Sequence, residues 1–440
     1  MKEISKYLYD FLDSEFFVNH NPNAKYTQNK KKKKQNNPHF PSSHENMDSI
    51  VTHLIEDVNR AYQEWNTIKH TIQETIPPKQ IPKGAIYNVI PQEAKNRIES
   101  SRHSSRNYNF AINHQNIELN IVYVFSEDDP ISKITPQKMD DYFKECLYKV
   151  FIWLSVAYKQ KHSECSQTLK IYLYLTDLFK IIPEKKENII DEIHANTAFT
   201  TSCAPSTEIH IFREEEWFKV LIHESFHCLG FDFSHYPVLA NYAKTQMLEI
   251  FPVKSDVNLF ETWCEMWGEL FNIIIYVTLH YRGNPAHAST PSTPSATPIP
   301  TPTPKILEEI KRALTYEQMF SLFQCVKVLQ HQELHYEDIC RGSQVASSYN
   351  ENTNVLSYYV IKSILMFFVD DFFGFMKKNN QSSLVFVNSM ENIRDYCLLI
   401  KKKYNNPHYI SEIHKIEKWY ESVLDYGIEN ITLRMTVLEW

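Results

Sequence analysis

The alternation of apolar and polar residues predicts a strand–helix–strand unit between residues 117 and 179. The segments IELNIVYVF (117–125) and LKIYLYLTDLF (169–179) are rich in β-branched and aromatic residues, as strands are. Between them, Gln137–Lys161 has apolar residues at helical spacing, namely Phe143, Cys146, Leu147, Val150, Phe151 and Leu154. Two strands joined by a helix indicate one right-handed βαβ unit.

Shorter extended segments and a further helix follow this unit. ANTAFTTS (195–202) and TEIHIF (207–212) have strand-like composition, and an amphipathic helix is expected to begin near Arg213. The chain after Lys305 is mainly helical in pattern, with weaker strand signals at 431–438. The predicted fold class is therefore α+β, an α/β subdomain followed by a mainly helical C-terminal subdomain.

Two segments of biased composition divide the chain. Residues 21–38 are rich in Asn and Lys, and residues 283–304 are rich in Pro and Thr. Both compositions are typical of segments without a packed core. The predicted parts are an N-terminal helical region (1–110) with the Asn/Lys-rich insert, a core (111–282), a linker (283–304) and a helical subdomain (305–440). The role of residues 1–110, as prodomain, partner-binding module or part of the core, stays open.

Composition and charge exclude several classes of function. Only seven of the 440 residues are glycine, whereas glycine usually makes up ~7% of a chain. The sequence contains no glycine-rich phosphate loop. With 46 basic and 53 acidic residues the net charge is −7, so the chain as a whole has no basic footprint for nucleic acid. The run Lys30–Lys34 is a local exception, and a solvated insert explains it better than a nucleic-acid tether.

Cysteine usage and apolar segments favour an intracellular protein that does not enter a membrane. Eight cysteines are scattered without a C-x-x-C pair, which favours a reducing compartment over a disulfide framework. The first residues lack the pattern of a secretory signal. The most apolar windows, Leu270–Leu279 and Ser363–Met376, are too short for a bilayer or carry two aspartates.

The sequence His223-Glu224-Ser225-Phe226-His227 is an H-E-x-x-H motif. On a helix, residues four apart share one face, so both imidazoles can bind one metal ion. Glu224 lies about 100° further round the helix. It can therefore act as general base for a metal-bound water, whose pKa zinc lowers towards ~7.

The residues around the motif favour a buried functional helix. Glu214–Glu216 are expected in its first turn, where the helix dipole favours acids, and Gly230 is expected to end it. A buried helix does not ordinarily carry two histidines and a glutamate unless a partner satisfies them. The alternative is a capped core helix with incidental histidines.

A catalytic zinc ion needs a third protein ligand, and a later acidic segment offers one. Glu261, Glu265 and Glu269 recur every four residues and so share one helical face among apolar neighbours. We assign Glu261 as the third ligand and Glu265 as the hydrogen-bond partner of a ligand histidine. The reverse, Glu265 as ligand and Glu269 as its support, stays open, as does a solvated acidic stripe. Gly268 indicates close packing of this helix against a neighbour.

Two residues just after the motif are further alternatives for the third ligand. The metzincin pattern H-E-x-x-H-x-x-G-x-x-H matches through Gly230 but would place its third ligand at Phe233, which cannot bind a metal. His235 comes two residues later, and Asp232 one residue earlier, than that position. Both are less favoured than Glu261.

H-E-x-x-H followed by a glutamate on a later helix, with another acid four residues on, resembles the gluzincin branch of the zincin metallopeptidases. The resemblance covers about residues 115–282, although the gap of 261 − 227 = 34 residues differs from the commonest gluzincin spacing. EWFKVLIHESFHCLGFDFS and FETWCEMWGEL also resemble uncharacterised zincin-like proteins of large DNA viruses. The resemblance implies that 195–202 or 207–212 is an edge strand that pairs with substrate.

The resemblance also implies a donor for the developing oxyanion. Tyr359 is the preferred residue, and the alternatives are Tyr358, Tyr349 and the group His331, His335 and Tyr336. The implied function is a Zn²⁺-dependent endopeptidase that acts on a peptide or protein substrate, in the host cell or virion if the protein is viral. The alternatives are a catalytically inactive zincin-like structural or binding protein and an α-rich interaction protein without metal. The substrate and the oligomeric state stay open.

Overall fold

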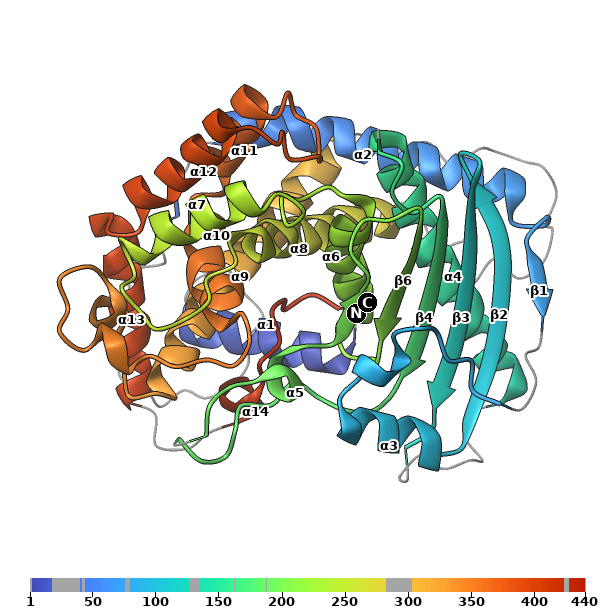
Figure 1. Ribbon diagram of the computed structural model, residues 1–440, viewed down its shortest axis with the longest axis horizontal. Coiled ribbons are helices and arrows are strands. Elements are labelled where there is room, and N and C mark those ends of the chain that lie inside the picture. The colour runs from blue at the N-terminus through green and yellow to red at the C-terminus, as the bar shows by residue number, and fades with distance from the viewer. Residues whose placement is uncertain are drawn as a thin grey trace.

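A six-stranded mixed sheet forms one side of the molecule (Figure 1). The computed structural model describes residues 2–17, 40–41, 44–75, 80–126, 135–161, 163–186, 188–281, 303–422 and 427–439. In spatial order the strands are β1 (Gln73–Thr75), β2 (His103–Ile112), β3 (Gln115–Val124), β4 (Thr168–Leu175), β6 (Ser206–Ile211) and β5 (Ala198–Thr200). The strands β3, β4 and β6 are parallel to one another, whereas β1, β2 and β5 are each antiparallel to a neighbour.

The predicted strand–helix–strand unit is confirmed. Helix α4 (Pro136–Gln160) connects β3 to β4, which pair in parallel with Ile117 opposite Leu169. Proline at the first turn and the Thr135 side chain, which accepts a hydrogen bond from the backbone N–H of Lys138 at 3.2 Å, begin the helix. Its apolar residues are buried against the sheet and the other helices.

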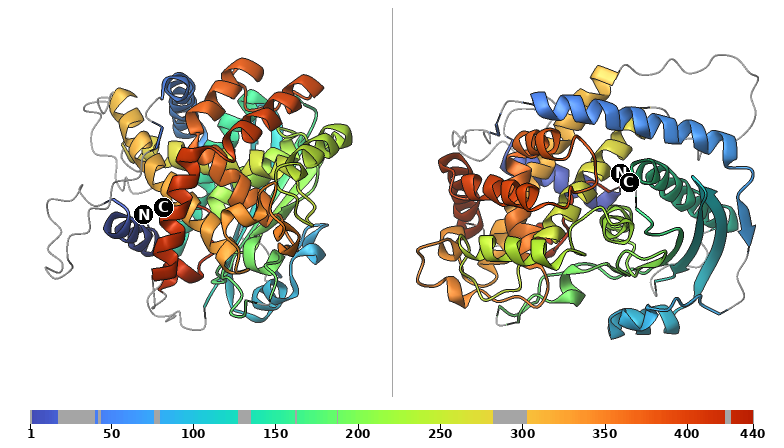
Figure 2. Two further views of the ribbon diagram at one scale, coloured as in Figure 1. Left: turned by 90° about the vertical axis from the view of Figure 1, so that its left-hand side faces the viewer. Right: turned by 45° about the horizontal axis from the view of Figure 1, so that its top comes forward.

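Alternate residues of the strands pack into two separate cores. On β4, Ile171 and Leu173 face the core that α4 and α6 share. Tyr172 and Tyr174 face the opposite side, where a smaller core lies under α3 (Gln92–Ser100) and η1 (Tyr87–Val89). Figure 2 shows α3 on the side of the sheet opposite to α4. The sheet is therefore covered on both faces.

The rest of the described chain is mainly helical, as predicted for residues 305–440. Long helices α2 and α9 pack against each other and against the central helix α8. The helices besides α3 and α4 are α1 (Glu3–Glu15), α2 (Glu45–Ile68), α5 (Glu192–Ala195), α6 (Trp217–Leu229), α7 (Pro237–Leu248), α8 (Leu259–His280), α9 (Thr303–Gln330), η3 (Tyr336–Ile339), η4 (Ala346–Ser348), the π-helix η5 (Leu356–Ile361), α10 (Lys362–Phe367), α11 (Val369–Asn379), α12 (Met390–Lys403), α13 (Pro407–Ser422) and α14 (Ile428–Ile431).

Several boundaries differ from the sequence predictions. The strands β1 and β2 lie in the region expected to be helical, and the boundary placed at residue 110 falls inside β2. The pattern of β2 was missed because most of its side chains are only half-buried. The strand signals at 431–438 correspond to an extended segment with a single bridge, from Thr432 to Ile181. The insert at 21–38, with Lys30–Lys34, and residues 283–302 of the linker lie outside the described residues.

A disulfide joins Cys165 to Cys203, with their Cα atoms 5.0 Å apart. The scattered spacing of the cysteines did not predict this pair, because residues 38 apart in sequence meet where β4 and β6 begin side by side. The expectation of a reducing compartment rested on that spacing. The other cysteines are free thiols, at positions 146, 228, 264, 325, 340 and 397.

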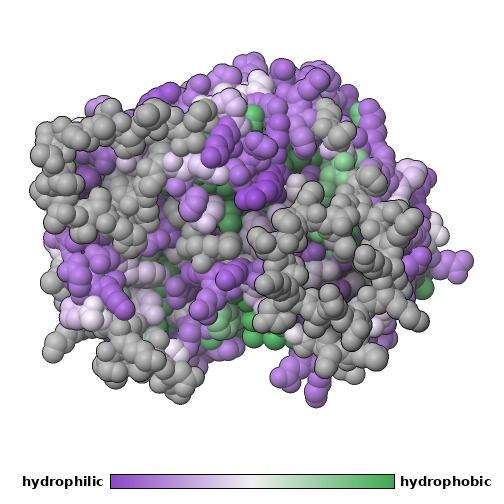
Figure 3. Space-filling view, turned by 180° about the vertical axis from the view of Figure 1, so that it is seen from behind, coloured by the Kyte–Doolittle hydropathy of each residue, from purple (hydrophilic) through white to green (hydrophobic). Residues whose placement is uncertain are grey.

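Among the described residues, no helix combines the length and the apolar character that crossing a bilayer would demand. Seen from behind, the residues not drawn in grey are mostly hydrophilic, with small hydrophobic areas between them (Figure 3).

Candidate metal centre

The helix with the H-E-x-x-H motif packs directly against the helix with the three glutamates. This helix, α6, is buried along most of its length and ends at Gly230, whose φ of 72° suits glycine. A Cβ atom on Gly268 of α8 would lie 3.3 Å from the carbonyl oxygen of Lys219 and 3.4 Å from Cβ of His223. The predicted close approach at Gly268 is thus confirmed, and it brings the acidic face of α8 to the histidines.

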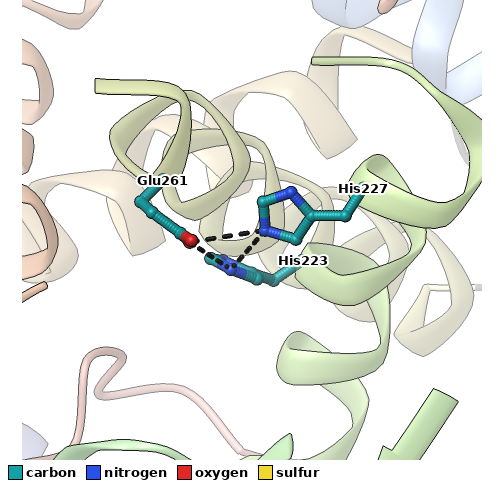
Figure 4. Close-up of side chains that lie close together, drawn as sticks. All are labelled: His223, His227 and Glu261. Atoms are coloured by element: carbon teal, nitrogen blue, oxygen red, sulfur yellow. Dashed lines mark hydrogen bonds and ion pairs between the residues drawn. The ribbon is translucent and has the colours of Figure 1, made fainter. Parts of the chain in front are cut away.

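Three ligand-type atoms converge between these helices. The Nε2 atoms of His223 and His227 lie 3.3 Å apart, and Oε2 of Glu261 lies 3.1 Å from the first and 3.3 Å from the second. Figure 4 shows both rings directed at the Glu261 carboxylate. Atoms bound ~2.0–2.1 Å from a tetrahedral zinc ion lie about 3.3–3.4 Å from one another. These three residues therefore fit a metal ion with little movement.

Carboxylates fix the outer nitrogen of each histidine. Nδ1 of His223 lies 3.0 Å from Oε2 of Glu265, and Nδ1 of His227 lies 2.5 Å from Oδ2 of Asp232. With Nδ1–H donating to a carboxylate, each imidazole presents the lone pair of Nε2 to the metal position. The buried ammonium of Lys219 pairs with Glu265 in turn. Glu261 thus lies with the two Nε2 atoms, and Glu265 lies at the outer nitrogen of His223.

The alternatives for the third ligand lie elsewhere. Glu269 pairs with Lys362 at 2.6 Å, so it supports no ligand glutamate. Nε2 of His235 accepts a hydrogen bond from the backbone N–H of Cys203 at 2.6 Å, and Asp232 lies on the outer side of His227. A second ligand-type group, made by His227, Asp232 and Cys264, uses that outer side. A solvated acidic stripe is contradicted because Glu265 and Glu269 are buried.

Tyr358, rather than Tyr359, lies at the centre. The hydroxyl of Tyr358 donates to Oε2 of Glu261 at 3.2 Å, whereas that of Tyr359 donates to the carbonyl of Leu433 at 2.6 Å. The preference for Tyr359 is corrected because consecutive side chains of the π-helix η5 point in different directions, and only Tyr358 faces Glu261. The other residues considered have partners away from the centre: Tyr349 with Glu351, Tyr336 with Tyr404, His331 with Asn188 and His335 with Asp338 and Glu417.

The charges around the ligand cluster favour a cation. Burial opposes a charged imidazole at His223, but hydrogen bonds to Glu261 and Glu265 outweigh it and raise the pKa. At His227, Cys264, Glu261 and Asp232 outweigh burial in the same way and raise the pKa of that imidazole. Burial also opposes ionisation of Glu261, yet both histidines hold its pKa well below the usual range. The cluster therefore attracts positive charge, which a metal ion would supply.

A pocket adjoins the cluster on the side of Glu224. It is lined by His223 and Glu224 from α6, by residues 195–198 leading into β5, and by Tyr358. Its volume of about 40 Å³ exceeds the ~10–15 Å³ that one water molecule needs. Burial raises the pKa of Glu224, which makes its carboxylate a stronger base. Glu224 thus lies beside the metal position without sharing in the ligand cluster.

Other contributors to the centre were missed or misplaced by sequence reasoning. Helix α6 begins at Trp217, so Glu214–Glu216 precede it, and Glu216 instead pairs with the buried Lys180 at 2.8 Å. Lys219 could have been identified, because it lies one helical turn before His223. Met435 lines the pocket from the C-terminal segment, and no sequence signal connects it with the motif.

No protein-family model, no curated protein and no solved structure matches this chain. Its function is therefore inferred from the geometry of the centre.

Proposed function

We propose that the protein is a zinc-dependent metallopeptidase. The proposal is carried by the convergence of His223, His227 and Glu261, with Glu224 beside them in a water-sized pocket. Two imidazoles and one carboxylate are a donor set that suits catalytic zinc, which keeps a further position open. A purely structural site would not need a base such as Glu224.

The protein groups have distinct roles in this proposal. Zinc held by the three ligands would activate a water molecule and polarise the scissile carbonyl. Glu224 accepts the proton as the water oxygen bonds to the carbonyl carbon, and then delivers it to the nitrogen as the C–N bond breaks. Tyr358 donates a hydrogen bond to the oxygen on which negative charge develops. Glu265 and Asp232 hold the ligand histidines in place.

The open edge of β5 supports a peptide substrate. The backbone N–H of Phe212 donates to the carbonyl of Thr197, and the N–H of Thr201 donates to the carbonyl of Glu208. The backbone groups of Thr197 and Thr201 therefore point towards β6. Because such pairs alternate in an antiparallel ladder, the N–H and C=O of Ala198 and Thr200 point away from β6. An extended peptide can add to this edge beside the pocket. The order of β3, α4, β4, antiparallel β5, β6 and α6 is also similar to the zincin arrangement expected from the sequence.

Peptide hydrolysis should require the metal. The zinc-loaded protein is expected to cleave members of a mixture of unstructured peptides, as measured by mass spectrometry. A chelator should stop cleavage, and stoichiometric zinc should restore it. A protein that binds one zinc ion per chain but leaves every peptide intact would contradict the proposal and favour a zincin-like binding protein.

Replacing Tyr358 with Phe is expected to lower kcat by about 10²–10³-fold in protein kept saturated with zinc, because the hydroxyl donor is lost. Tyr359→Phe is the matched control. It removes a hydroxyl bonded to Leu433, so it should cost about 1 kcal/mol of unfolding free energy and leave kcat unchanged. Steady-state kinetics and thermal unfolding measure both variants. Equal kcat losses in the two would remove Tyr358 from the mechanism.

A further inference from the structure

The C-terminal segment 432–439 crosses the interior as an extended chain. Figure 1 shows it running from α14 towards the start of α6, where both chain ends lie. Every residue from Thr432 to Glu439 is buried. The backbone N–H of Lys2 donates to the carbonyl of Glu439 at 2.9 Å, which ties the segment to the N-terminal residues.

Beyond the bridge from Thr432 to Ile181, the backbone of this segment bonds mainly to buried side chains rather than to a neighbouring strand. Oε1 of Glu216 accepts hydrogen bonds from the N–H of Met435 at 2.9 Å and of Thr436 at 2.7 Å. Nζ of Lys362 donates to the carbonyl of Met435 at 3.0 Å. Glu216 also lies directly before α6, the helix of the H-E-x-x-H motif. Met435 is therefore held from both sides at a fixed position relative to the centre.

The side chain of Met435 forms part of the pocket wall beside Glu224. Its Sδ lies 3.4 Å from Nζ of Lys219, and the other walls include Thr197, Val220 and Tyr358. Because Met435 is only 3% exposed, it fills space into which the pocket would otherwise extend. The hollow is small, with a volume of about 40 Å³, a few times what one water molecule needs.

We propose that Met435 limits the substrate side chain next to Glu224 to a small, uncharged one, that of glycine, alanine or serine. The inference rests on the proposed peptidase function and specifies its substrate class. A wall that a methionine fills rejects larger side chains because inserting them would force buried atoms apart.

Charge does not override this size limit. Both lysines that line the pocket already have buried partners, Lys180 with Glu216 at 2.8 Å and Lys219 with Glu265. An acidic side chain would have to compete with these carboxylates and would face Glu224. A basic one would exceed the space available. The pocket therefore selects by size among uncharged side chains.

Peptide hydroxamates that differ only in the side chain adjacent to the metal-binding group test the inference by affinity, without requiring turnover. Calorimetry on the zinc-loaded protein should show the glycine, alanine and serine probes binding at least about tenfold more tightly than the leucine, phenylalanine and aspartate probes. In Met435→Ala the affinity for the leucine probe should rise at least about tenfold relative to the affinity for the alanine probe. Met435→Val, a milder truncation, should shift the ranking in the same direction.

Two controls separate pocket size from stability. Met435→Leu keeps the volume and should keep the ranking of the wild type. Val437→Ala truncates a buried residue of the same segment that does not line the pocket, so it should lower the melting temperature and leave the ranking unchanged. An unchanged ranking in Met435→Ala and Met435→Val, or equal wild-type affinity for the alanine and leucine probes, would overturn the inference.

The outcomes also distinguish this inference from the proposed function. If the zinc-loaded protein binds the probes in the expected order but cleaves no peptide, the size limit is supported and the peptidase function is contradicted. If the protein cleaves peptides whatever the size of this side chain, the peptidase function is supported and the size limit is contradicted. Protein that binds no zinc overturns both.

Discussion

Replacing Glu224 with Gln is expected to lower peptide hydrolysis by about 10²–10⁴-fold while the protein keeps its zinc. The amide has nearly the shape of the carboxylate but cannot accept the proton of the attacking water. Because Glu224 stands outside the cluster of His223, His227 and Glu261, the metal affinity should change little. Single-turnover hydrolysis and elemental analysis on the same preparation measure the two properties.

The matched control is Glu249→Gln, the same chemical change on the surface, where Glu249 pairs with Lys401. It should leave both hydrolysis and zinc content unchanged. Undiminished hydrolysis in Glu224→Gln would rule out Glu224 as the base. A simultaneous loss of zinc would show that Glu224 belongs to the ligand set instead.

Removing the third ligand should have a larger effect on metal affinity than removing its neighbour. Glu261→Gln is expected to weaken zinc binding by more than about 10²-fold, because one charged ligand is lost. Glu265→Gln should weaken it by about 10–100-fold, because Glu265 acts on the metal position through its hydrogen bond to His223 and not as a ligand. Competition with a fluorescent zinc chelator at fixed pH gives both dissociation constants.

Glu269→Gln completes the series, since Glu269 pairs with Lys362 and lies one helical turn beyond Glu265. Its zinc affinity should equal that of the unaltered protein. If Glu265→Gln lost more affinity than Glu261→Gln, and Glu269→Gln lost some as well, the reverse ligand assignment would be correct. Circular dichroism of the metal-free variants checks that each still folds.

The parts of the centre that depend on local periodicity could be predicted from the sequence. The two histidines share a face of α6 because they are four residues apart, and the glutamates share a face of α8 for the same reason. The choice between Glu261 and Glu265 was harder, because they differ by one helical turn, or about 5.4 Å. It depends on where the two helices touch, and Gly268 marks that contact.

The parts that depend on distant segments could not be predicted. Adjacent tyrosines at 358 and 359 have similar surroundings in sequence, and only the orientation of η5 places one of them at Glu261. The sequence does not predict strand β2, because its half-buried residues HSSRNYNFAI have no clear apolar alternation. Met435 reaches the pocket through an extended segment held by side chains, an arrangement that has no periodic pattern.

Anomalous diffraction on either side of the zinc absorption edge tests the central claim most directly. Crystals of the protein grown with stoichiometric zinc should show one strong anomalous peak per chain, bounded by Nε2 of His223, Nε2 of His227 and a carboxylate oxygen of Glu261. The signal should vanish below the edge. A crystal that shows no peak there, or a peak with other ligands, would contradict the account.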